Sequence, residues 1–294
     1  MSALKNPHAP FDAALAAALA ANVRDALAED IGSGDLTGML VPAGQQASAH
    51  VIVREQAVLC GAPWFESVMQ QVDPGIRIDW RHAEGELMDE GGTVCTMQGA
   101  ARSLLTAERT ALNFLQLLSG VASATRRHVD MVAGTRARVL DTRKTLPGLR
   151  LAQKYAVRVG GGANQRLALY DGILIKENHI AAAGGVTAAF RAAQALGTGA
   201  PVQIEVESLA QLDEALHAGA TSILLDNFST ALMRDAVALV AGRAVLEASG
   251  GVSMATLREI AETGVDRISV GALTKDVRAT DYSMRFDSSV SLKQ

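Results

Sequence analysis

The chain has 294 residues, of which 49% are hydrophobic and only 4% aromatic, and it carries a formal net charge of −4. This is an ordinary globular composition. The acidic balance argues against a protein that binds nucleic acid or anionic membranes, since such proteins carry a basic excess. Two cysteines, Cys60 and Cys95, are too few for a disulfide framework, and the six histidines are too scattered for a histidine-rich metal centre. We therefore expect a cytoplasmic globular protein.

The first predicted element is a helix over residues 11–27, where apolar side chains recur at helical spacing. Its alanine-rich stretch, residues 13–21, resembles the apolar core of a signal peptide. We interpret it as part of an amphipathic helix, because it follows Asp12 and runs directly into polar and charged residues. The Gly-Ser-Gly-Asp segment at 32–35 is expected to break the helical pattern. No run in the chain reaches the 18 apolar residues that a membrane span needs.

A small sheet is expected next. Residues 47–59, 77–80 and 92–97 are predicted to form short strands, because β-branched residues gather there between glycine and proline turns.

Residues 101–119 are predicted to form a strongly amphipathic helix. Gly120 is expected to end it, as glycine often does at a helix C-terminus. The side chains expected to face inward are Leu104, Leu105, Leu112, Leu115 and Leu118.

From residue 137 onward the chain repeats one unit, a short apolar strand followed by a helix. This alternation is typical of a parallel sheet with crossover helices. The six predicted strands lie at residues 137–141, 172–176, 202–207, 222–227, 244–250 and 267–271.

Polar groups or glycines stand at or just after the end of each of these strands, and they are the candidate site residues. A closed barrel brings such strand ends together at one mouth, but an open doubly wound sheet also gathers ligands at strand C-termini, so the residues alone leave both folds open. Neither a P-loop motif nor a strand-linked dinucleotide-binding motif is present. The candidates are Arg143, Lys144, Lys176, Glu205, Asp226, Ser249, Gly250, Gly251 and Gly271.

The loop after the first of these strands places Arg143 and Lys144 side by side, followed by Pro147. Taken alone, this pair is as consistent with a solvated basic turn as with an anion site. In an anion site, Arg143 would form a bidentate fork to a carboxylate or phosphate, whereas Lys144 would offer a point charge.

Longer motifs resemble the quinolinate phosphoribosyltransferase family. The segments 154–166 (KYAVRVGGGANQR) and 170–180 (YDGILIKENHI), together with the loop 141–150 (DTRKTLPGLR), carry the resemblance. It covers nearly the whole chain, in order. Further matching segments are 29–37, 106–113, 205–207, 225–227, 247–251 and 264–274.

The resemblance implies an α/β fold with two domains. An N-terminal α/β sandwich would comprise residues 1–118, joined by the C-terminal segment 279–294, and a seven-stranded α/β barrel would comprise residues 119–278. The implied reaction joins quinolinate to phosphoribosyl pyrophosphate and releases nicotinate mononucleotide, pyrophosphate and CO2, with Mg²⁺ as cofactor, in de novo NAD synthesis.

The resemblance also implies roles for individual residues. The equivalents of Arg109, Arg143, Arg166 and Lys176 hold the dicarboxylate in this family, and those of Lys144 and Lys176 reach the donor phosphates. A homodimer is implied, in which Arg109 enters the partner subunit's site. A net-acidic protein needs such a concentrated cationic pocket to bind these anions.

Glu205 and Asp226 are the expected Mg²⁺ ligands, directly or through water, because Mg²⁺ prefers oxygen ligands and takes one or two carboxylates. The alternative for either carboxylate is a plain salt bridge. Lys176, Glu205 and Asp226 are expected to be catalytic. The backbone amides at Ser249, Gly250, Gly251 and Gly271 would approach a phosphate closely, although these glycines also suit ordinary strand-to-helix turns.

The chain departs from the family pattern at two positions. Gln165 stands where the family usually has histidine, which excludes an acid–base role at that position. Lys275 replaces a second histidine and keeps positive charge near the phosphates. We expect His179 to be a hydrogen-bonded scaffold residue and not a catalytic base.

Other functions remain open from the sequence. Lys176 at a strand end is also typical of Schiff-base lyases. Related proteins include nicotinate-specific phosphoribosyltransferases that do not decarboxylate, and proteins linked with molybdenum transport. A phosphometabolite-binding protein without enzymatic activity is a further alternative.

Overall fold

The structure is a computed structural model that describes residues 2–287. These residues divide into two compact units. The first unit takes the described residues of Met1–Arg126, Leu146–Gly161 and Asp276–Gln294, and the second takes Arg127–Thr145 and Gly162–Lys275. These bounds differ from the expected domains at 1–118 and 119–278, because residues 119–126, 146–161 and 276–278 group with the first unit. Of the expected C-terminal segment 279–294, residues 288–294 lie outside the described part.

The first unit contains a four-stranded antiparallel sheet in the order β12-β1-β5-β3. The predicted strands at 77–80 and 92–97 are confirmed as β3 and β5, whereas the stretch predicted at 47–59 is divided into β1 and β2, and β2 pairs with β4 in a separate two-stranded sheet. The C-terminal strand β12 pairs with β1 along the sheet edge, from Ala49 opposite Phe286 to Val53 opposite Tyr282. The strands of this unit are β1 (Gln46–Val53), β2 (Ala57–Val58), β3 (Arg77–Trp80), β4 (Leu87–Met88), β5 (Thr93–Ala100) and β12 (Tyr282–Phe286).

Helices cover this sheet and enclose an apolar core that includes Trp64, Phe65 and Tyr155. The first helix is α1 (Ala13–Ile31), as predicted; Asp12 caps its N-terminus by accepting a hydrogen bond from Leu15 N at 2.8 Å, and Gly32 ends it. The others are η1 (Gly38–Leu40), α2 (Ala62–Val72), α3 (Ala101–Met131) and α4 (Arg150–Val159).

The expectation that Gly120 ends the long helix is wrong. The helix α3 passes through this position and continues to Met131. A Cβ atom at Gly120 would overlap the carbonyl oxygen of Arg278, in the segment that leads into β12. Glycine is therefore required here because another backbone segment lies against the helix. Of the five predicted inward leucines, four are buried and Leu105 is only half-buried.

The second unit contains a six-stranded sheet whose strands all run parallel, in the order β6-β11-β10-β9-β8-β7. All six strands were predicted. They are β6 (Arg138–Leu140), β7 (Ile173–Ile175), β8 (Val202–Val206), β9 (Ser222–Asp226), β10 (Val245–Ser249) and β11 (Arg267–Ser269).

The sheet has two edge strands among the described residues. No strand pairing within residues 2–287 joins β6 to β7, and a seventh strand is not present there; a single parallel bridge places Ala163 beside Leu140 of β6.

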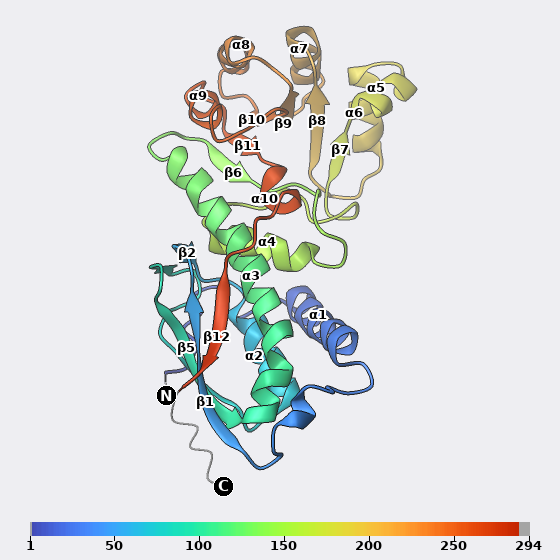
Figure 1. Cartoon of the computed structure of the whole chain (residues 1–294). Coiled ribbons are helices and arrows are strands. Elements are labelled where there is room, and N and C mark those ends of the chain that lie inside the picture. Colours follow the sequence, from blue (N-terminus) through green and yellow to red (C-terminus); the bar gives the residue numbers. More distant parts are fainter. Residues whose placement is uncertain (1, 288–294) are drawn as a thin grey trace. The chain divides into compact units, whose positions relative to one another are not determined.

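Most strands of the second unit are followed by a helix, and successive helices from α5 to α9 are neighbours. Figure 1 shows these helices along the outer side of the strands. None of the helices in the described part of the chain combines the length and apolar character of a membrane span. The helices are α5 (Glu177–Ala183), α6 (Val186–Ala195), α7 (Leu209–His217), α8 (Thr230–Val240), α9 (Leu257–Ala261) and α10 (Ala272–Lys275).

Candidate functional site

The carboxyl ends of the parallel strands lie along one edge of the second unit's sheet, and most of the predicted site residues are found there. Lys176, Glu205, Asp226 and Ser249 stand at the ends of β7, β8, β9 and β10, which are consecutive neighbours in the sheet. In parallel sheets covered by helices, ligand-binding and active sites lie at the carboxyl ends of the strands.

Lys176 and Glu205 form an ion pair across neighbouring strands. Lys176 Nζ lies 3.2 Å from Glu205 Oε2, and the two side chains are 50% and 12% exposed. The ammonium is therefore held at the entrance of the edge, while the carboxylate lies deeper. An ammonium group offers three hydrogen-bond donors and no acceptor, so Lys176 can donate to a bound anion while it remains in contact with Glu205.

Two arginines, Arg143 after β6 and Arg166 before β7, influence each other electrostatically. Burial, and then the neighbouring guanidinium of Arg143, lower the pKa of Arg166. Arg166 Nη1 donates to the carbonyl oxygen of Gly172 at 3.0 Å, just before β7. Like charges held near each other create a strong local preference for an anion, and two guanidinium groups suit planar carboxylates.

The loop after β6 contacts the start of α10. Thr274 Oγ1 donates to the carbonyl oxygen of Lys144 at 2.7 Å. A Cβ atom at Gly271 would lie 3.2 Å from Lys144 Cδ, so the absence of a side chain there leaves room for the lysine stem. The loop thus brings Lys144 together with Gly271. Lys144 and Lys275 are both exposed.

The turn after β10 approaches the end of β9 very closely. Asn227 N donates to the carbonyl oxygen of Ser249 at 3.0 Å, and the Asn227 side chain donates to Asp226 Oδ2 at 2.8 Å. A Cβ atom at Gly250 would overlap the Asn227 amide, and both Gly250 and Gly251 have positive φ, 92° and 62°. This overlap requires glycine at position 250. At Gly251, by contrast, an added Cβ atom would meet no neighbouring segment within 4 Å.

His179 has the scaffold position expected of it. Its Nδ1 accepts a hydrogen bond from the backbone N of Lys176 at 3.0 Å, which secures the first turn of α5. The imidazole therefore supports the backbone that carries Lys176.

The carboxylates at this edge have the chemistry of divalent-cation ligands. Among residues 2–287, no three His, Cys, Asp or Glu side chains are grouped closely enough to form a metal site from protein atoms alone. Glu205 and Asp226 supply the hard oxygen ligands that Mg²⁺ prefers, and Mg²⁺ commonly takes only one or two carboxylates, with phosphate oxygens and waters completing its shell. The two residues thus fit a Mg²⁺ ion that is held jointly with a bound phosphate.

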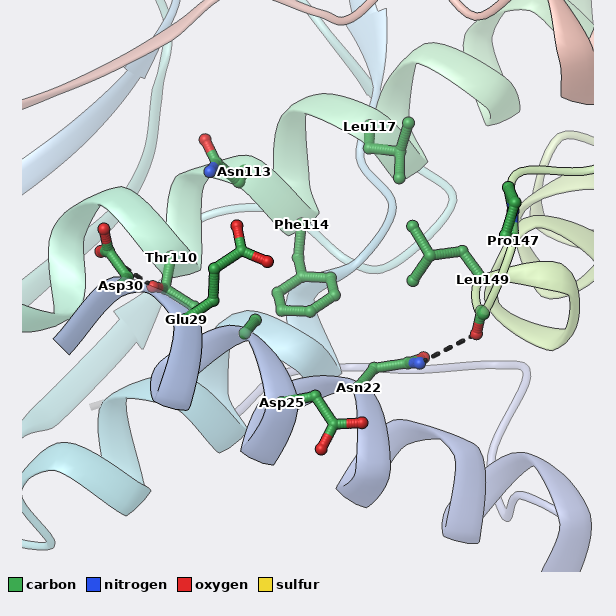
Figure 2. A pocket seen from close by; sticks show the side chains of 12 residues that line it. Asn22, Asp25, Glu29, Asp30, Thr110, Asn113, Phe114, Leu117, Pro147 and Leu149 are labelled. Atoms are coloured by element: carbon green, nitrogen blue, oxygen red, sulfur yellow. Dashed lines mark hydrogen bonds between the residues drawn. The ribbon is translucent and has the colours of Figure 1, made fainter. Parts of the chain in front are cut away.

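Arg109 belongs to the first unit, where it is exposed on α3. The next residue, Thr110, lines a cavity of about 380 Å³ between α1, α3 and the segment 147–149 (Figure 2). Asp25, Glu29 and Asp30 give this cavity an acidic wall, and the apolar wall includes Phe114 and Leu117. Its charge is opposite to that required by a dicarboxylate or phosphate ligand, so the cationic strand edge of the second unit is the better candidate site.

Sequence reasoning missed a layer of buried polar residues in the sheet. Gln203, Glu247 and Ser269 are each less than 10% exposed and are hydrogen-bonded to one another. Asp141 is fully buried and accepts hydrogen bonds from Asn164 Nδ2 at 2.6 Å and Gln165 N at 2.9 Å. A signal was available, because a glutamine and a glutamate in the middle of strands that are otherwise apolar must face polar partners.

Comparison with known protein families gives two consecutive matches along the chain. Residues 35–119 match the family described as "Quinolinate phosphoribosyl transferase, N-terminal domain", and residues 121–285 match "Quinolinate phosphoribosyl transferase, C-terminal domain". Together they span most of the described residues.

Individual relatives are similar over nearly their full length. A protein named nicotinate-nucleotide pyrophosphorylase [carboxylating] from Mycobacterium leprae is 45% identical over 269 residues, covering 89% of this chain and 95% of the relative. A probable nicotinate-nucleotide pyrophosphorylase [carboxylating] from Bacillus subtilis is 39% identical, with 87% and 89% coverage. The solved structure of the nicotinate-nucleotide pyrophosphorylase from Francisella tularensis superposes with a TM-score of 0.90 at 43% identity, covering 92% of this chain and 96% of that one.

Proposed function

Because this chain belongs to the quinolinate phosphoribosyltransferase family, we propose that it transfers the phosphoribosyl group of phosphoribosyl pyrophosphate to quinolinate. The products are nicotinate mononucleotide, pyrophosphate and CO2, and the reaction is a step of de novo NAD synthesis. The observation that carries the proposal is the row of Lys176, Glu205, Asp226 and Ser249 at the ends of consecutive parallel strands, with Arg143 acting electrostatically on Arg166 in the same unit.

We assign the binding of quinolinate to Arg143, Arg166 and Lys176, since two adjacent carboxylates require several cations at close range. Lys144 and Lys275, with the backbone amides at Ser249, Gly250, Gly251 and Gly271, are assigned to the phosphate and pyrophosphate of the donor. Glu205 orients Lys176 through the ion pair at 3.2 Å. Glu205 and Asp226 also lie at the edge where ribose hydroxyls would be held.

With both ligands fixed, the pyridine nitrogen attacks the anomeric carbon of the ribose while the bond from that carbon to the pyrophosphate oxygen breaks. The transition state has oxocarbenium character, and no protein nucleophile is needed. The electron pair of the bond to the adjacent carboxylate then stays on the ring carbon, where the positively charged pyridine nitrogen stabilises it. CO2 leaves, and the ring carbon takes up a proton. Positioning and electrostatic stabilisation account for the catalysis.

We propose Mg²⁺ as the cofactor, with Glu205 and Asp226 as its protein ligands, directly or through water. When bound, Mg²⁺ supplies charge neutralisation to the departing pyrophosphate.

We further propose a homodimer in which Arg109 enters the partner's site. Arg109 is exposed on α3, and it is the one predicted dicarboxylate ligand that belongs to the first unit. A two-fold dimer makes such an exchange reciprocal, so both sites would gain a fourth cation for the dicarboxylate.

We also propose that residues 119–278 close into the seven-stranded barrel, preceded by the α/β sandwich of residues 1–118 with 279–294. Two contacts support closure. Ala163 bridges to β6 while Gln165 donates to Gln203 of β8, so this segment extends from one edge of the sheet toward the other. Glu247 of β10 also reaches Gln203 across the intervening strand β9, which requires a strongly concave sheet face.

A cytoplasmic location is part of the proposal, since Cys60 and Cys95 are buried free thiols. The Schiff-base alternative is disfavoured because Lys176 is paired with Glu205. Borohydride reduction in the presence of substrate should trap no adduct on Lys176.

The decisive assay measures pyrophosphate release with Mg²⁺ and phosphoribosyl pyrophosphate, comparing pyridine-2,3-dicarboxylate with nicotinate. We expect release, with an equal amount of CO2, only from the dicarboxylate. Turnover of nicotinate would instead identify a phosphoribosyltransferase that does not decarboxylate. Binding of both ligands without pyrophosphate release would identify a binding protein.

A further inference from the structure

A line of hydrogen-bonded polar side chains, three of them buried and one half-buried, joins strands β8, β10 and β11 of the second unit to the segment before β7. Gln165 Nε2 donates to Gln203 Oε1 at 2.9 Å, and Gln203 Nε2 donates to Glu247 Oε2 at 2.9 Å. Ser269 Oγ donates to the other carboxylate oxygen, Glu247 Oε1. We name these four residues, Ser269, Glu247, Gln203 and Gln165, the buried relay.

The relay has a direction, because an ionised carboxylate only accepts hydrogen bonds. Glu247 requires Gln203 to turn its NH2 group toward it, so the carbonyl oxygen of Gln203 faces Gln165. Gln165 must therefore direct its own NH2 group toward that carbonyl oxygen. Rotating either amide by half a turn would bring two oxygens or two NH2 groups into contact.

Burial makes a reversed orientation of these amides energetically costly. Glu247 is 1% exposed, Ser269 5% and Gln203 8%, so water does not replace a lost partner easily. A buried donor or acceptor without a partner costs about 1–3 kcal/mol. The charge of Glu247 therefore fixes the orientation of an amide that lies on another segment of the chain.

The backbone of Gln165 is held independently. Asp141, which is fully buried, accepts hydrogen bonds from Gln165 N at 2.9 Å and from Asn164 Nδ2 at 2.6 Å. Gln165 is thus fixed by its main chain on Asp141 and by its side chain on the relay. The next residue, Arg166, extends from a backbone that is anchored on two buried carboxylates.

Arg166 needs such an anchor. Burial and then the positive charge of Arg143 lower the pKa of its guanidinium, while Asp171 acts in the opposite direction, and its Nη1 donates to the carbonyl oxygen of Gly172 at 3.0 Å. A flexible segment would let the two groups separate in the free protein, and the ligand would then have to bring them together. A rigid support removes that cost in advance.

We propose that Glu247, acting through Gln203 and Gln165, is a positioning residue that keeps the guanidinium of Arg166 beside that of Arg143, ready for the carboxylates of the pyridine substrate. Glu247 itself touches no reacting atom. The proposal rests on the proposed function, because the ligand it serves is the pyridine dicarboxylate.

The test moves the carboxylate by one position along the relay. Gln203→Glu alone sets a second carboxylate against Glu247 and breaks the relay. Gln203→Glu combined with Glu247→Gln restores it, since the new carboxylate at position 203 accepts from Gln165 and from the new amide at 247. Ser269 still donates to the carbonyl oxygen at 247, and the NH2 group of Gln165 still points inward.

The readout is the steady-state kinetics of the full chain with Mg²⁺ at pH 8. At this pH, the two carboxylates at positions 203 and 247 of the single variant are less able to share a proton. We expect Gln203→Glu to raise the KM for pyridine-2,3-dicarboxylate roughly tenfold, the effect of one lost hydrogen bond in this range, with the KM for phosphoribosyl pyrophosphate changed less than about twofold. The double variant should return the dicarboxylate KM to within about threefold of the wild type. Thermal unfolding of each variant is measured in parallel.

Each outcome decides the matter. If the double variant recovers its melting temperature but not its dicarboxylate KM, the relay stabilises the fold without positioning Arg166. Equal effects on both KM values, or no effect of Gln203→Glu, also overturn the proposal. Should the single variant fail to fold, the folded double variant decides, because a dicarboxylate KM that stays raised at a wild-type melting temperature overturns the proposal. A wild-type protein that neither binds nor turns over the dicarboxylate refutes the proposed function itself.

Discussion

At the scale of single residues, the site depends on charges that are placed against one another. Burial, and then the positive charge of Arg143, lower the pKa of Arg166, and Lys176 is paired with Glu205. Arginine suits the first pair because its planar fork binds a carboxylate with two parallel hydrogen bonds, whereas lysine serves as a point charge that a carboxylate can steer. The arginines therefore suit a carboxylate group of a bound ligand, whereas Lys176 supplies a single positive charge to another anionic group.

Substituting Arg166→Ala should weaken binding of the dicarboxylate more than binding of the sugar donor. Truncating one partner of a buried charge pair typically costs about 2–5 kcal/mol, and the remaining guanidinium of Arg143 can supply only part of the recognition. Titration calorimetry with each ligand measures the difference. Arg191→Ala, at an exposed position on α6, is the matched control. Equal weakening of both ligands would contradict the assignment of Arg166 to the dicarboxylate.

At the scale of elements, close approach between backbones decides where glycine must stand. Gly120 lies in the middle of α3, against the carbonyl oxygen of Arg278. Gly250 is required where the turn after β10 approaches Asn227 at the end of β9. In both cases, the neighbouring segment and not the local helix or turn propensity excludes a side chain.

Gly120→Ala should therefore destabilise the protein, although alanine is the better helix former. Helix propensity alone predicts a gain of about 0.5–1 kcal/mol. We expect a loss of about 1–3 kcal/mol, because the added methyl group must displace the backbone at Arg278. Urea unfolding measures the change, with Arg127→Ala, exposed on the same helix, as control. A more stable Gly120→Ala variant would show that the two segments separate at little cost.

The start of α2 rests on a buried carboxylate. Glu84 is 1% exposed and accepts hydrogen bonds from Gly61 N, Ala62 N and the hydroxyl of Tyr155 on α4, at 2.8, 3.2 and 2.9 Å. Burial raises the pKa of Glu84 to about 7 in spite of these hydrogen bonds. This single group therefore links the stability of the first unit to pH near neutrality.

The folded pKa of Glu84 lies above its ordinary value of 4.5, so the folded state binds the proton more tightly than the unfolded chain does. Its contribution to stability is fully present below pH 4.5 and is lost as the pH rises through about 7. Between pH 5 and 8, the wild type should lose about 3 kcal/mol of unfolding free energy relative to Glu84→Gln. Urea unfolding across this range tests it, with exposed Glu90→Gln as control. Parallel curves for wild type and Glu84→Gln would refute the link.

At the scale of the whole molecule, the chain divides its predicted ligands between two compact units. Arg109 belongs to the first unit, and the other assigned residues belong to the second. The proposed homodimer gives this division a function, because each active site would be built from two chains. The stability of the site would then depend on assembly as well as on folding.

Arg109→Ala and Lys176→Ala should each be inactive alone and should complement each other when they are unfolded together and refolded. Every heterodimer would hold one intact site and one doubly damaged site, so random mixing should restore about a quarter of the wild-type sites. Pyrophosphate release from the refolded mixture measures the recovery. If heterodimers form and no activity returns, Arg109 acts within its own chain or only structurally.

The sequence by itself determined the order and type of the elements in the second unit, because apolar strands alternating with amphipathic helices have few other ways to bury their surface. It also determined the candidate residues at the strand ends and the family to which the chain belongs. The tertiary structure alone decided that Gly120 lies inside a helix, that residues 146–161 group with the first unit, and that Gln165, Gln203, Glu247 and Ser269 form a relay. These features depend on which distant segments come into contact, and local periodicity carries no information about such contacts.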